Sequence, residues 1–355
     1  VLGYTVEGFK EKDNGVEVLL KDNPSLQADM VVLAIGVTPD TVLAKEAGLE
    51  LGIKESIVVN DRMETSVPDI YAAGDAVQVK HYVTGNDALI SLAGPANKQG
   101  RIIADNICGG DSRYLGSQGS SVIKVFDMTA ATTGINETNA KKSGLEVDTV
   151  ILSPMSHAGY YPGGKVMTMK VVFEKETYRL LGAQIIGYKG VDKRIDVLAT
   201  AIHAGLKATQ LKDLDLAYAP PYSSAKDPVN MAGFMIDNIA KGTLKQWHLE
   251  DMDKISKDKS VVLLDVRTVG EFNRGHMDGF KNIPVDELRE RINEIEKGKP
   301  VYLICQSGLR SYIASRILEG NGYETYNFSG GFRFYDVVVN DRVLIERSYV
   351  CGMDY

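Results

Sequence analysis

The sequence predicts a protein that joins α/β and α+β folding units in series, and three observations carry this prediction. The chain has 355 residues, of which 44% are hydrophobic, enough for two or three separate cores. Strand and helix patterns alternate over most of its length. Near the C-terminal end, a short apolar run stops at Cys305, and a glycine-containing loop then leads into a helical pattern. Such alternation is typical of domains in which helices cover a sheet.

The first 60 residues contain two predicted strands and a short helix. One strand covers residues 16–20, and an apolar run over residues 30–35 indicates a buried strand that ends at Gly36. Thr38-Pro39-Asp40 predicts a turn, and the helix that follows runs to Ala47 and is ended by Gly48.

Residues 68–76 form a stretch that favours ligand binding. They place small residues and Gly74 at the predicted end of a strand, directly before Asp75 and Ala76. A backbone without large side chains lets a ligand approach, and an aspartate there can accept a hydrogen bond from a hydroxyl group. The alternative is an ordinary turn from a strand into a loop, and the stretch taken alone does not separate the two.

Residues 119–244 are predicted to form a sheet with helices and contain no dinucleotide-binding motif. The predicted strands cover residues 122–126, 129–133, 149–152, 166–173 and 179–186. Asn136 is the predicted N-cap of a helix that ends at Gly144, and residues 191–204 form a second helix. A third helix has Asp227 as its N-cap and Pro228 in its first turn.

Residues 301–318 predict a strand, a loop and a helix, with Cys305 at the helix N-terminus. Unpaired backbone N–H groups and the positive end of the helix favour a thiolate at that place. Arg310 adds a fixed cation five positions later. A buried and inert cysteine at a strand end is the alternative, but it does not need the turn that follows here. We therefore predict a reactive cysteine.

The residues around Cys305 resemble the rhodanese family over roughly residues 245–340. The resemblance rests on Leu264-Asp265-Val266-Arg267, Glu271-Phe272, Gly275-His276-Met277, Gly279, Asn282-Ile283-Pro284 and Gly330-Gly331-Phe332. It implies that the Cys305 thiolate attacks a sulfane donor, becomes a persulfide and passes the sulfur on. The anionic persulfide is then expected to lie beside Arg310 in the loop formed by Gln306, Ser307, Gly308, Leu309 and Ser311. Phosphatases on the same scaffold have a longer loop, whereas four residues separate cysteine and arginine here.

Residues 1–240 resemble the pyridine nucleotide-disulfide oxidoreductase family in the order and spacing of three segments. These are residues 34–39, residues 71–76 and residues 92–101. The resemblance implies FAD as a cofactor, with Asp75 on its ribityl chain and a helix that opens at Pro95 facing the flavin ring. The cofactor-binding residues it implies are Gly36, Gly74, Asp75, Ala76, Ala93, Gly94 and Pro95. The implied domains are the end of an NAD(P)H-binding domain (1–37), part of an FAD-binding domain (38–118), a dimerisation domain (119–244) and a rhodanese domain (245–355).

Parts of the family pattern are missing from the sequence. There is no G-x-G-x-x-G fingerprint for either nucleotide, and no redox cysteine of the kind found near the family's N-terminus. The chain also begins at Val1, without an initiator methionine. We expect the C-terminal part of a longer protein, in preference to a degenerate remnant.

Two further segments resemble the coenzyme A-disulfide reductase branch of this family. They are residues 156–163 and residues 216–222. By this resemblance, Tyr160 and Tyr218 point across a homodimer toward the sulfur substrate, where a phenol can donate a hydrogen bond to a developing thiolate. The alternative is that both tyrosines only pack a dimer interface.

Composition limits the partners of the chain. A net charge of -7 and the lack of a basic tract argue against nucleic acid and anionic membranes, and no apolar run approaches the roughly 20 residues of a membrane span. Three distant cysteines form no disulfide framework and indicate a reducing compartment, which we expect to be the cytoplasm. We expect no metal site, a structural role for Cys108, and a frayed terminus around Cys351.

Together the resemblances imply an FAD-dependent reductase fused to a rhodanese sulfurtransferase. Its substrates would be coenzyme A-disulfide, persulfides or polysulfides, with NAD(P)H as hydride donor and coenzyme A as a bound thiol. The sequence does not choose between NADH and NADPH, and it does not name the sulfur donor. Two alternatives stay open: an NADH oxidase-type flavoprotein, and a dimeric rhodanese sulfur carrier without reductase activity.

Overall fold

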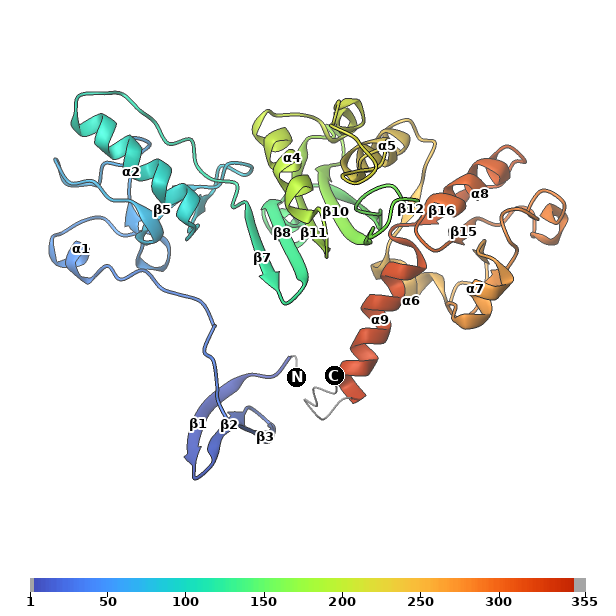
Figure 1. The fold of residues 1–355 in the computed structure, drawn as a ribbon, viewed down its shortest axis with the longest axis horizontal. Coiled ribbons are helices and arrows are strands. Elements are labelled where there is room, and N and C mark those ends of the chain that lie inside the picture. Colours follow the sequence, from blue (N-terminus) through green and yellow to red (C-terminus); the bar gives the residue numbers. More distant parts are fainter. Residues whose placement is uncertain (1–2, 348–355) are drawn as a thin grey trace. The chain divides into compact units, whose positions relative to one another are not determined.

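The computed structural model describes residues 3–347, and the side chains of residues 3–339. The chain forms two compact units. One unit holds the described residues up to Thr38 and, from Asp336 onward, the end of helix α9 (Gly331–Arg347), and the other holds Pro39–Tyr335. Figure 1 follows the elements of both in chain order. Within the described residues, no helix combines the length and the apolar character needed to cross a membrane.

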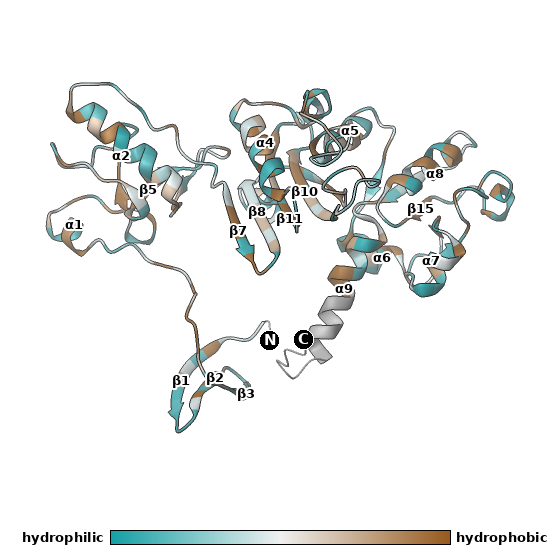
Figure 2. Cartoon of the chain, viewed as in Figure 1, coloured by the Kyte–Doolittle hydropathy of each residue, from teal (hydrophilic) through white to brown (hydrophobic). Residues whose placement is uncertain are grey.

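The N-terminal strands form an antiparallel meander of β1 (Val6–Lys12), β2 (Gly15–Leu20) and β3 (Asn23–Ala28). Strand β2 confirms the prediction for residues 16–20. The predicted buried strand at residues 30–35 is wrong, because this run forms no strand and Val32 and Ile35 are 75% and 92% exposed. A buried strand needs neighbouring strands to satisfy its backbone, and no strand of the described residues pairs with this run. Figure 2 shows the segment as a hydrophobic stretch between β3 and α1.

Residues 39–118 combine short strands with one long helix. Helix α1 (Val42–Glu46) ends before Gly48, as predicted, and the 3₁₀ turn η1 (Ile53–Glu55) follows it. Strand β5 (Val77–Lys80) pairs in parallel with β4 (Ile57–Val58) and antiparallel with β6 (Asp87–Ala88). The 3₁₀ turn η2 (Gly74–Ala76) leads into β5, and helix α2 (Ala93–Ile107) follows β6. The strand predicted just before Gly74 is only a single bridge between Glu64 and Tyr71.

A five-stranded antiparallel sheet forms the centre of the second unit. Its order is β7 (Ser121–Val125), β8 (Met128–Gly134), β11 (Leu180–Gly187), β10 (Met167–Glu174), β9 (Val147–Leu152). The helices are α3 (Glu137–Lys142), α4 (Val191–His203), the 3₁₀ helix η3 (Ala208–Asp213) and α5 (Pro228–Ala240). Asn136 and Asp227 cap α3 and α5 with their side chains, as predicted. Apolar residues of α4 and α5, among them Leu198 and Ile236, form one buried core with the sheet.

A five-stranded parallel sheet carries the candidate active site. Its order is β12 (Gln246–Trp247), β16 (Thr325–Phe328), β15 (Val301–Ile304), β13 (Val262–Asp265), β14 (Lys281–Asn282). The short helical elements are η4 (Leu249–Asp251), α6 (Met252–Ile255), α7 (Val269–Arg274) and η5 (Ile292–Glu294), and α8 (Leu309–Glu319) follows β15. Because all strands are parallel, the loops after β13 and β15 leave from the same edge of the sheet.

The two large sheets are joined by direct contacts as well as by the chain. The Ile151 N–H of β9 donates to Ser329 Oγ at 3.1 Å, and Gln246 Nε2 donates to the Thr149 carbonyl at 3.2 Å. His248 Nε2 lies 3.2 Å from Asp148 Oδ1. Edge strand β9 is therefore contacted by residues of β12 and of the segments that flank the parallel sheet.

Candidate active site

Cys305 lies between β15 and α8, and its sulfur faces two hydrogen-bond donors. The Gly308 N–H donates to Sγ at 3.1 Å, and Ser311 Oγ lies 3.2 Å from the same sulfur. The residue is 1% exposed, and the 11-residue helix α8 starts four positions later. Donors and a positive helix end around one sulfur stabilise negative charge on it. The predicted geometry of strand, cysteine, loop and helix is confirmed.

Two glycines allow the loop to close around the sulfur. Gly308 has φ 98°, in the left-handed region, and is the N-cap of α8. Gly331 also has a positive φ, and a Cβ atom there would lie 2.7 Å from the Ser307 nitrogen and 2.8 Å from the Cys305 oxygen. The start of α9 therefore packs directly on the loop, and the Phe332 N–H donates to the Cys305 carbonyl at 2.8 Å.

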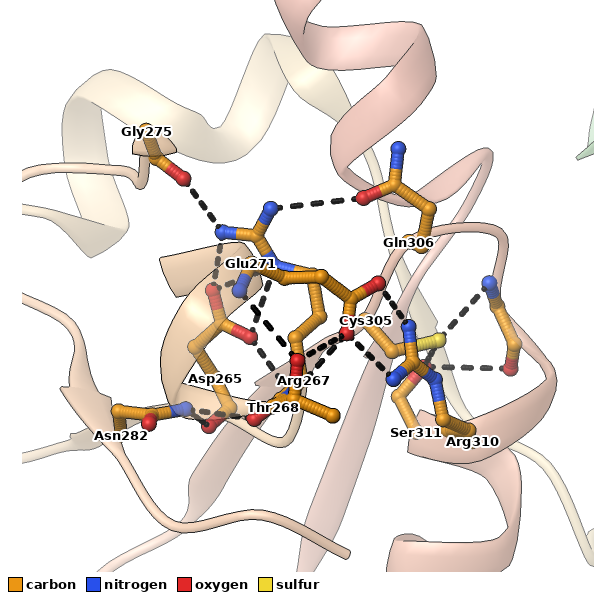
Figure 3. A network of polar contacts seen from close by, with 11 residues as sticks. Asp265, Arg267, Thr268, Glu271, Gly275, Asn282, Cys305, Gln306, Arg310 and Ser311 are labelled. Carbon is orange, nitrogen blue, oxygen red and sulfur yellow. Dashed lines mark hydrogen bonds and ion pairs between the residues drawn. The ribbon is translucent and has the colours of Figure 1, made fainter. Parts of the chain in front are cut away.

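Arg310 is not a free cation, because Glu271 binds it from helix α7. The two terminal nitrogens of the guanidinium donate to the two carboxylate oxygens at 2.7 and 2.6 Å (Figure 3). The Arg310 hydrogen bonds, opposed by partial burial and assisted by Thr268, lower the pKa of Glu271 to about 2. Glu271 also accepts from the Thr268 backbone N–H at 3.0 Å and so completes a capping box for α7.

A buried ion pair between Arg267 and Asp265 lies beside the loop that follows Cys305. Arg267 and Asp265 are 1% and 0% exposed, and Arg267 Nη2 lies 2.6 Å from Asp265 Oδ2. Arg267 also donates to Gln306 Oε1 at 3.4 Å, and its guanidinium carbon lies 3.9 Å from the centre of the Phe332 ring. One side chain thus contacts the end of β13, the cysteine loop and the start of α9. The sequence placed these residues in a motif but did not indicate that Glu271 and Arg267 reach the loop.

The lowered pKa of Glu271 makes the stability of the folded protein depend on pH. Because the folded pKa of Glu271 is about 2, below its ordinary value of 4.5, the ion pair contributes full stability above about pH 5 and loses it as the pH falls toward 2. We expect the urea midpoint of the chain, followed by Trp247 fluorescence, to fall between pH 5 and pH 3 by less in Glu271→Gln than in the wild type. Gln can keep the capping box through its amide oxygen, while it removes the charge and one of the two hydrogen bonds accepted from Arg310. Equal falls in both proteins would contradict the assignment.

The structure brings the side chains of Tyr160 and Tyr218 together. Their orientation toward a substrate across a homodimer stays a prediction. Their hydroxyl oxygens lie 3.0 Å apart, although 58 residues separate them, and they are 77% and 45% exposed. The hydrogen bond between the two hydroxyls raises the pKa of Tyr218. Tyr218 also lines a pocket of about 540 Å³ with Lys189, Lys193 and Tyr222.

The buried side chain of Arg194 connects the loop that carries Tyr160 with the loop that carries Tyr218. It donates to the Ser156 carbonyl at 3.0 Å in one loop and to Ser223 Oγ at 3.1 Å beyond the other. Asp227 balances its charge at 2.8 Å. Burial opposes ionisation of Asp227, but hydrogen bonds from Arg194, Ser223 and the Val229 N–H hold its pKa below the usual range.

The residues predicted to hold FAD lie in η2 and at the start of α2. The Gly74 N–H donates to Gln99 Oε1 of α2 at 2.7 Å, so the two elements are neighbours. The Asp75 side chain is exposed. Helix α2 begins at Ala93, two residues before the predicted start at Pro95, and its first turn has no acidic residue. An exposed carboxylate beside an open helix N-terminus fits the hydroxyls and the electron-rich ring edge of a flavin.

Gly36, Cys108 and Cys351 were also singled out in the sequence. Gly36 lies in the exposed segment after β3, with φ 100°. Cys108 is exposed at the end of α2. Cys351 lies outside the described residues. Within the part of the chain that the structure describes, no cluster of His, Cys, Asp or Glu could hold a metal ion.

Three family models match consecutive parts of the chain. Residues 1–100 match the pyridine nucleotide-disulphide oxidoreductases, residues 120–228 match their dimerisation domain, and residues 248–335 match the rhodanese-like domain. The chain belongs to the pyridine nucleotide-disulphide oxidoreductase family and carries a C-terminal rhodanese-like domain. Members of this family use FAD and NAD(P)H. The resemblances to the rhodanese family and to the pyridine nucleotide-disulfide oxidoreductase family are thereby confirmed.

Several solved structures and curated proteins are similar to this chain. Reduced CoADR-RHD from Bacillus anthracis is 46% identical with a TM-score of 0.91, covering 96% of this chain and 60% of that one. An NAD-dependent persulfide reductase from A. fulgidus is 40% identical with a TM-score of 0.85, covering 94% and 61%. The NAD(P)H sulfur oxidoreductase (CoA-dependent) of Pyrococcus furiosus is 38% identical over 60% of this chain and 48% of its own length. The chain spans about half the length of the curated relatives it matches.

Proposed function

We propose that this chain is the sulfur-transferring and dimer-forming part of an FAD-dependent persulfide, polysulfide or coenzyme A-disulfide reductase. The observation that carries the proposal is the Cys305 sulfur, which faces the Gly308 N–H and the Ser311 hydroxyl at 3.1 and 3.2 Å at the head of α8. Such a site suits a thiolate and the persulfide anion formed from it.

The proposed transfer begins with attack of the Cys305 thiolate on the outer sulfur of a sulfane donor. A new sulfur–sulfur bond forms at Cys305, the donor's sulfur–sulfur bond breaks, and its electron pair leaves with the released thiolate or sulfite. The product is a Cys305 persulfide. Backbone N–H groups of the loop and the positive helix end stabilise its terminal charge.

The reductase half of the proposal rests on residues 74–95. Asp75 would accept hydrogen bonds from the ribityl hydroxyls of FAD, and the N-terminus of α2 would face the flavin ring, with Ala93, Gly94 and Pro95 in its first turn. Bound FAD would supply two electrons received as hydride from NAD(P)H. The chain itself contains no fingerprint for NAD(P)H.

We further propose a homodimer that binds coenzyme A as a thiol, in a reducing cytoplasm. The match to the dimerisation domain supports the dimer, as do exposed apolar residues of the β7–β8 hairpin: Val122, Ile123, Val125 and Phe126. The paired tyrosines would donate a hydrogen bond to the leaving thiolate of the substrate. Lys189 and Lys193 beside Tyr218 suit the phosphates of coenzyme A.

The test is persulfide formation on the purified chain. After anaerobic incubation with a polysulfide, peptide mass spectrometry should find one added sulfur atom on Cys305 that a thiol acceptor removes. Cys108, which is exposed, provides the internal control and should not turn over. No sulfur on Cys305, or equal turnover at Cys108, would contradict the sulfurtransferase role.

Two alternatives make different predictions for the protein as purified. An NADH oxidase-type flavoprotein would consume oxygen faster than it reduces persulfide. A dimeric sulfur carrier would be colourless and would still transfer sulfur.

Glu271 should restrict the use of dianionic donors. Since it binds both terminal nitrogens of Arg310, the cation does not present its full charge to an incoming anion. We expect Glu271→Gln to raise kcat/KM for the dianion thiosulfate roughly threefold to tenfold, the range of an interaction worth about 1 kcal/mol, and to raise that for a singly charged alkyl persulfide by less. Steady-state sulfur transfer with both donors measures this. A loss with both donors would instead indicate that Glu271 orients Arg310.

A further inference from the structure

The hydroxyl group of Ser311 has one proton and two acceptors within reach. Its oxygen lies 3.2 Å from the Cys305 sulfur and 3.1 Å from the Gly308 carbonyl oxygen. A hydroxyl donates one hydrogen bond at a time. Ser311 is 0% exposed, so bulk water does not compete for the proton. The choice between the two acceptors decides whether the sulfur receives one hydrogen bond or two.

The carbonyl oxygen of Gly308 is already occupied by two other donors. The Tyr312 N–H donates to it at 3.1 Å in the first turn of α8. Asn327 Nδ2, from strand β16, also donates to it at 3.1 Å. A carbonyl oxygen has two lone pairs, so a third donor finds no good acceptor site there. The Ser311 proton is therefore left for the sulfur.

Within residues 3–347, the buried amide group of Asn327 has a hydrogen-bond partner only for its nitrogen. Asn327 is 3% exposed, and its Oδ1 atom is buried without a hydrogen-bond partner among the described residues. Burying an amide oxygen in this way costs free energy that an apolar side chain of similar size would avoid. The bond from Nδ2 to the Gly308 carbonyl is the compensating interaction.

We propose that Asn327 is a positioning residue for sulfur transfer: it occupies the Gly308 carbonyl and thereby directs the Ser311 hydroxyl to Cys305. The inference rests on the proposed function of Cys305. Asn327 acts from strand β16 without touching the sulfur. Removing it allows Ser311 to turn to the carbonyl and leaves the thiolate with the Gly308 N–H alone.

The test is a double-mutant cycle on the pH dependence of alkylation. Peptide mass spectrometry follows reaction of Cys305 with iodoacetamide in the full chain. Ser311→Ala should raise the pH of half-maximal alkylation by about one unit, because a hydrogen bond to a charged acceptor is worth roughly a factor of ten. Asn327→Leu should raise it by up to the same amount. The double variant should shift no further than Ser311→Ala alone.

Thr325→Val is the matched control. Thr325 lies on the same strand, is 1% exposed and donates to Glu319 Oε1 at 2.8 Å, near the far end of α8. This variant should leave the alkylation profile unchanged. Folding is verified from the emission of Trp247, and Asn327→Thr, which suits a strand, replaces Asn327→Leu if that variant does not fold.

An unchanged profile in the folded Asn327 variant would overturn the proposal, as would shifts of the two single variants that add in the double variant. A comparable shift in Thr325→Val would also overturn it, because the effect would then be a general loosening of α8. Failure of the proposed sulfur transfer is a separate result. Even in a chain that takes up no sulfur, the pH dependence of Cys305 alkylation can be measured in the single and double variants, and it tests the role of Asn327.

Discussion

Cys305→Ala is expected to lower sulfur transfer by at least about a thousandfold, because it removes the proposed nucleophile and no neighbouring group can carry the sulfur. The loop itself should persist, since the Gly308 and Gly331 conformations and the Phe332 N–H bond to the residue 305 carbonyl involve only backbone. The measurement is transfer of sulfur from thiosulfate or polysulfide to a thiol acceptor.

Cys108→Ser is the matched control for this variant, because Cys108 is exposed at the end of α2 and should retain full transfer. In the full-length, flavin-loaded protein, Cys305→Ala should leave reduction of the flavin by NAD(P)H intact. Persistent sulfur transfer in Cys305→Ala would refute the role of this cysteine, and loss of flavin reduction would contradict independent roles for the two halves.

Asp265→Ala is expected to destabilise the rhodanese-like domain by about 3–5 kcal/mol. The change leaves the guanidinium of Arg267, which is 1% exposed, without its counter-ion in a buried site. Urea unfolding followed by fluorescence measures the effect. The chain has one tryptophan, and Trp247 is 2% exposed and packs on Phe328 at 4.4 Å between ring centres, so its emission reports this domain.

Glu294→Ala provides the control for Asp265→Ala. It removes a surface ion pair in the same domain, between Glu294 (53% exposed) and Arg291 (35% exposed). The variant should lose less than about 1 kcal/mol of unfolding free energy. If Asp265→Ala lowers the free energy of unfolding by less than about 1 kcal/mol, Arg267 has found another partner. Replacing both members of the buried pair with apolar residues should restore most of the stability.

The local geometry of the candidate site was predictable from sequence. An apolar run that stops at Cys305, a glycine and a helical pattern specify strand, loop and helix over fewer than about 20 residues, where periodicity and capping are the main signals. The same holds for Asn136 and Asp227, whose side chains cap the helices that follow them. The boundaries of the four predicted domains stay predictions.

The run at residues 30–35 shows where such reasoning fails. Its composition matches a buried strand, yet a strand exists only when neighbours satisfy its backbone, and the described residues supply none. Hydrophobicity predicts that a segment can be buried. It does not determine what the segment is buried against.

By itself, the sequence determined the family and the strand, loop and helix around Cys305, and it predicted that this cysteine is reactive. Only the tertiary structure decided which side chains meet there: Glu271 on Arg310 from 39 positions away, and Asn327 on Gly308 from 19. The physical reason is that parallel strands bring distant loops to one edge of the sheet, and the partners across that edge follow from strand order and register. Local periodicity carries no information about either.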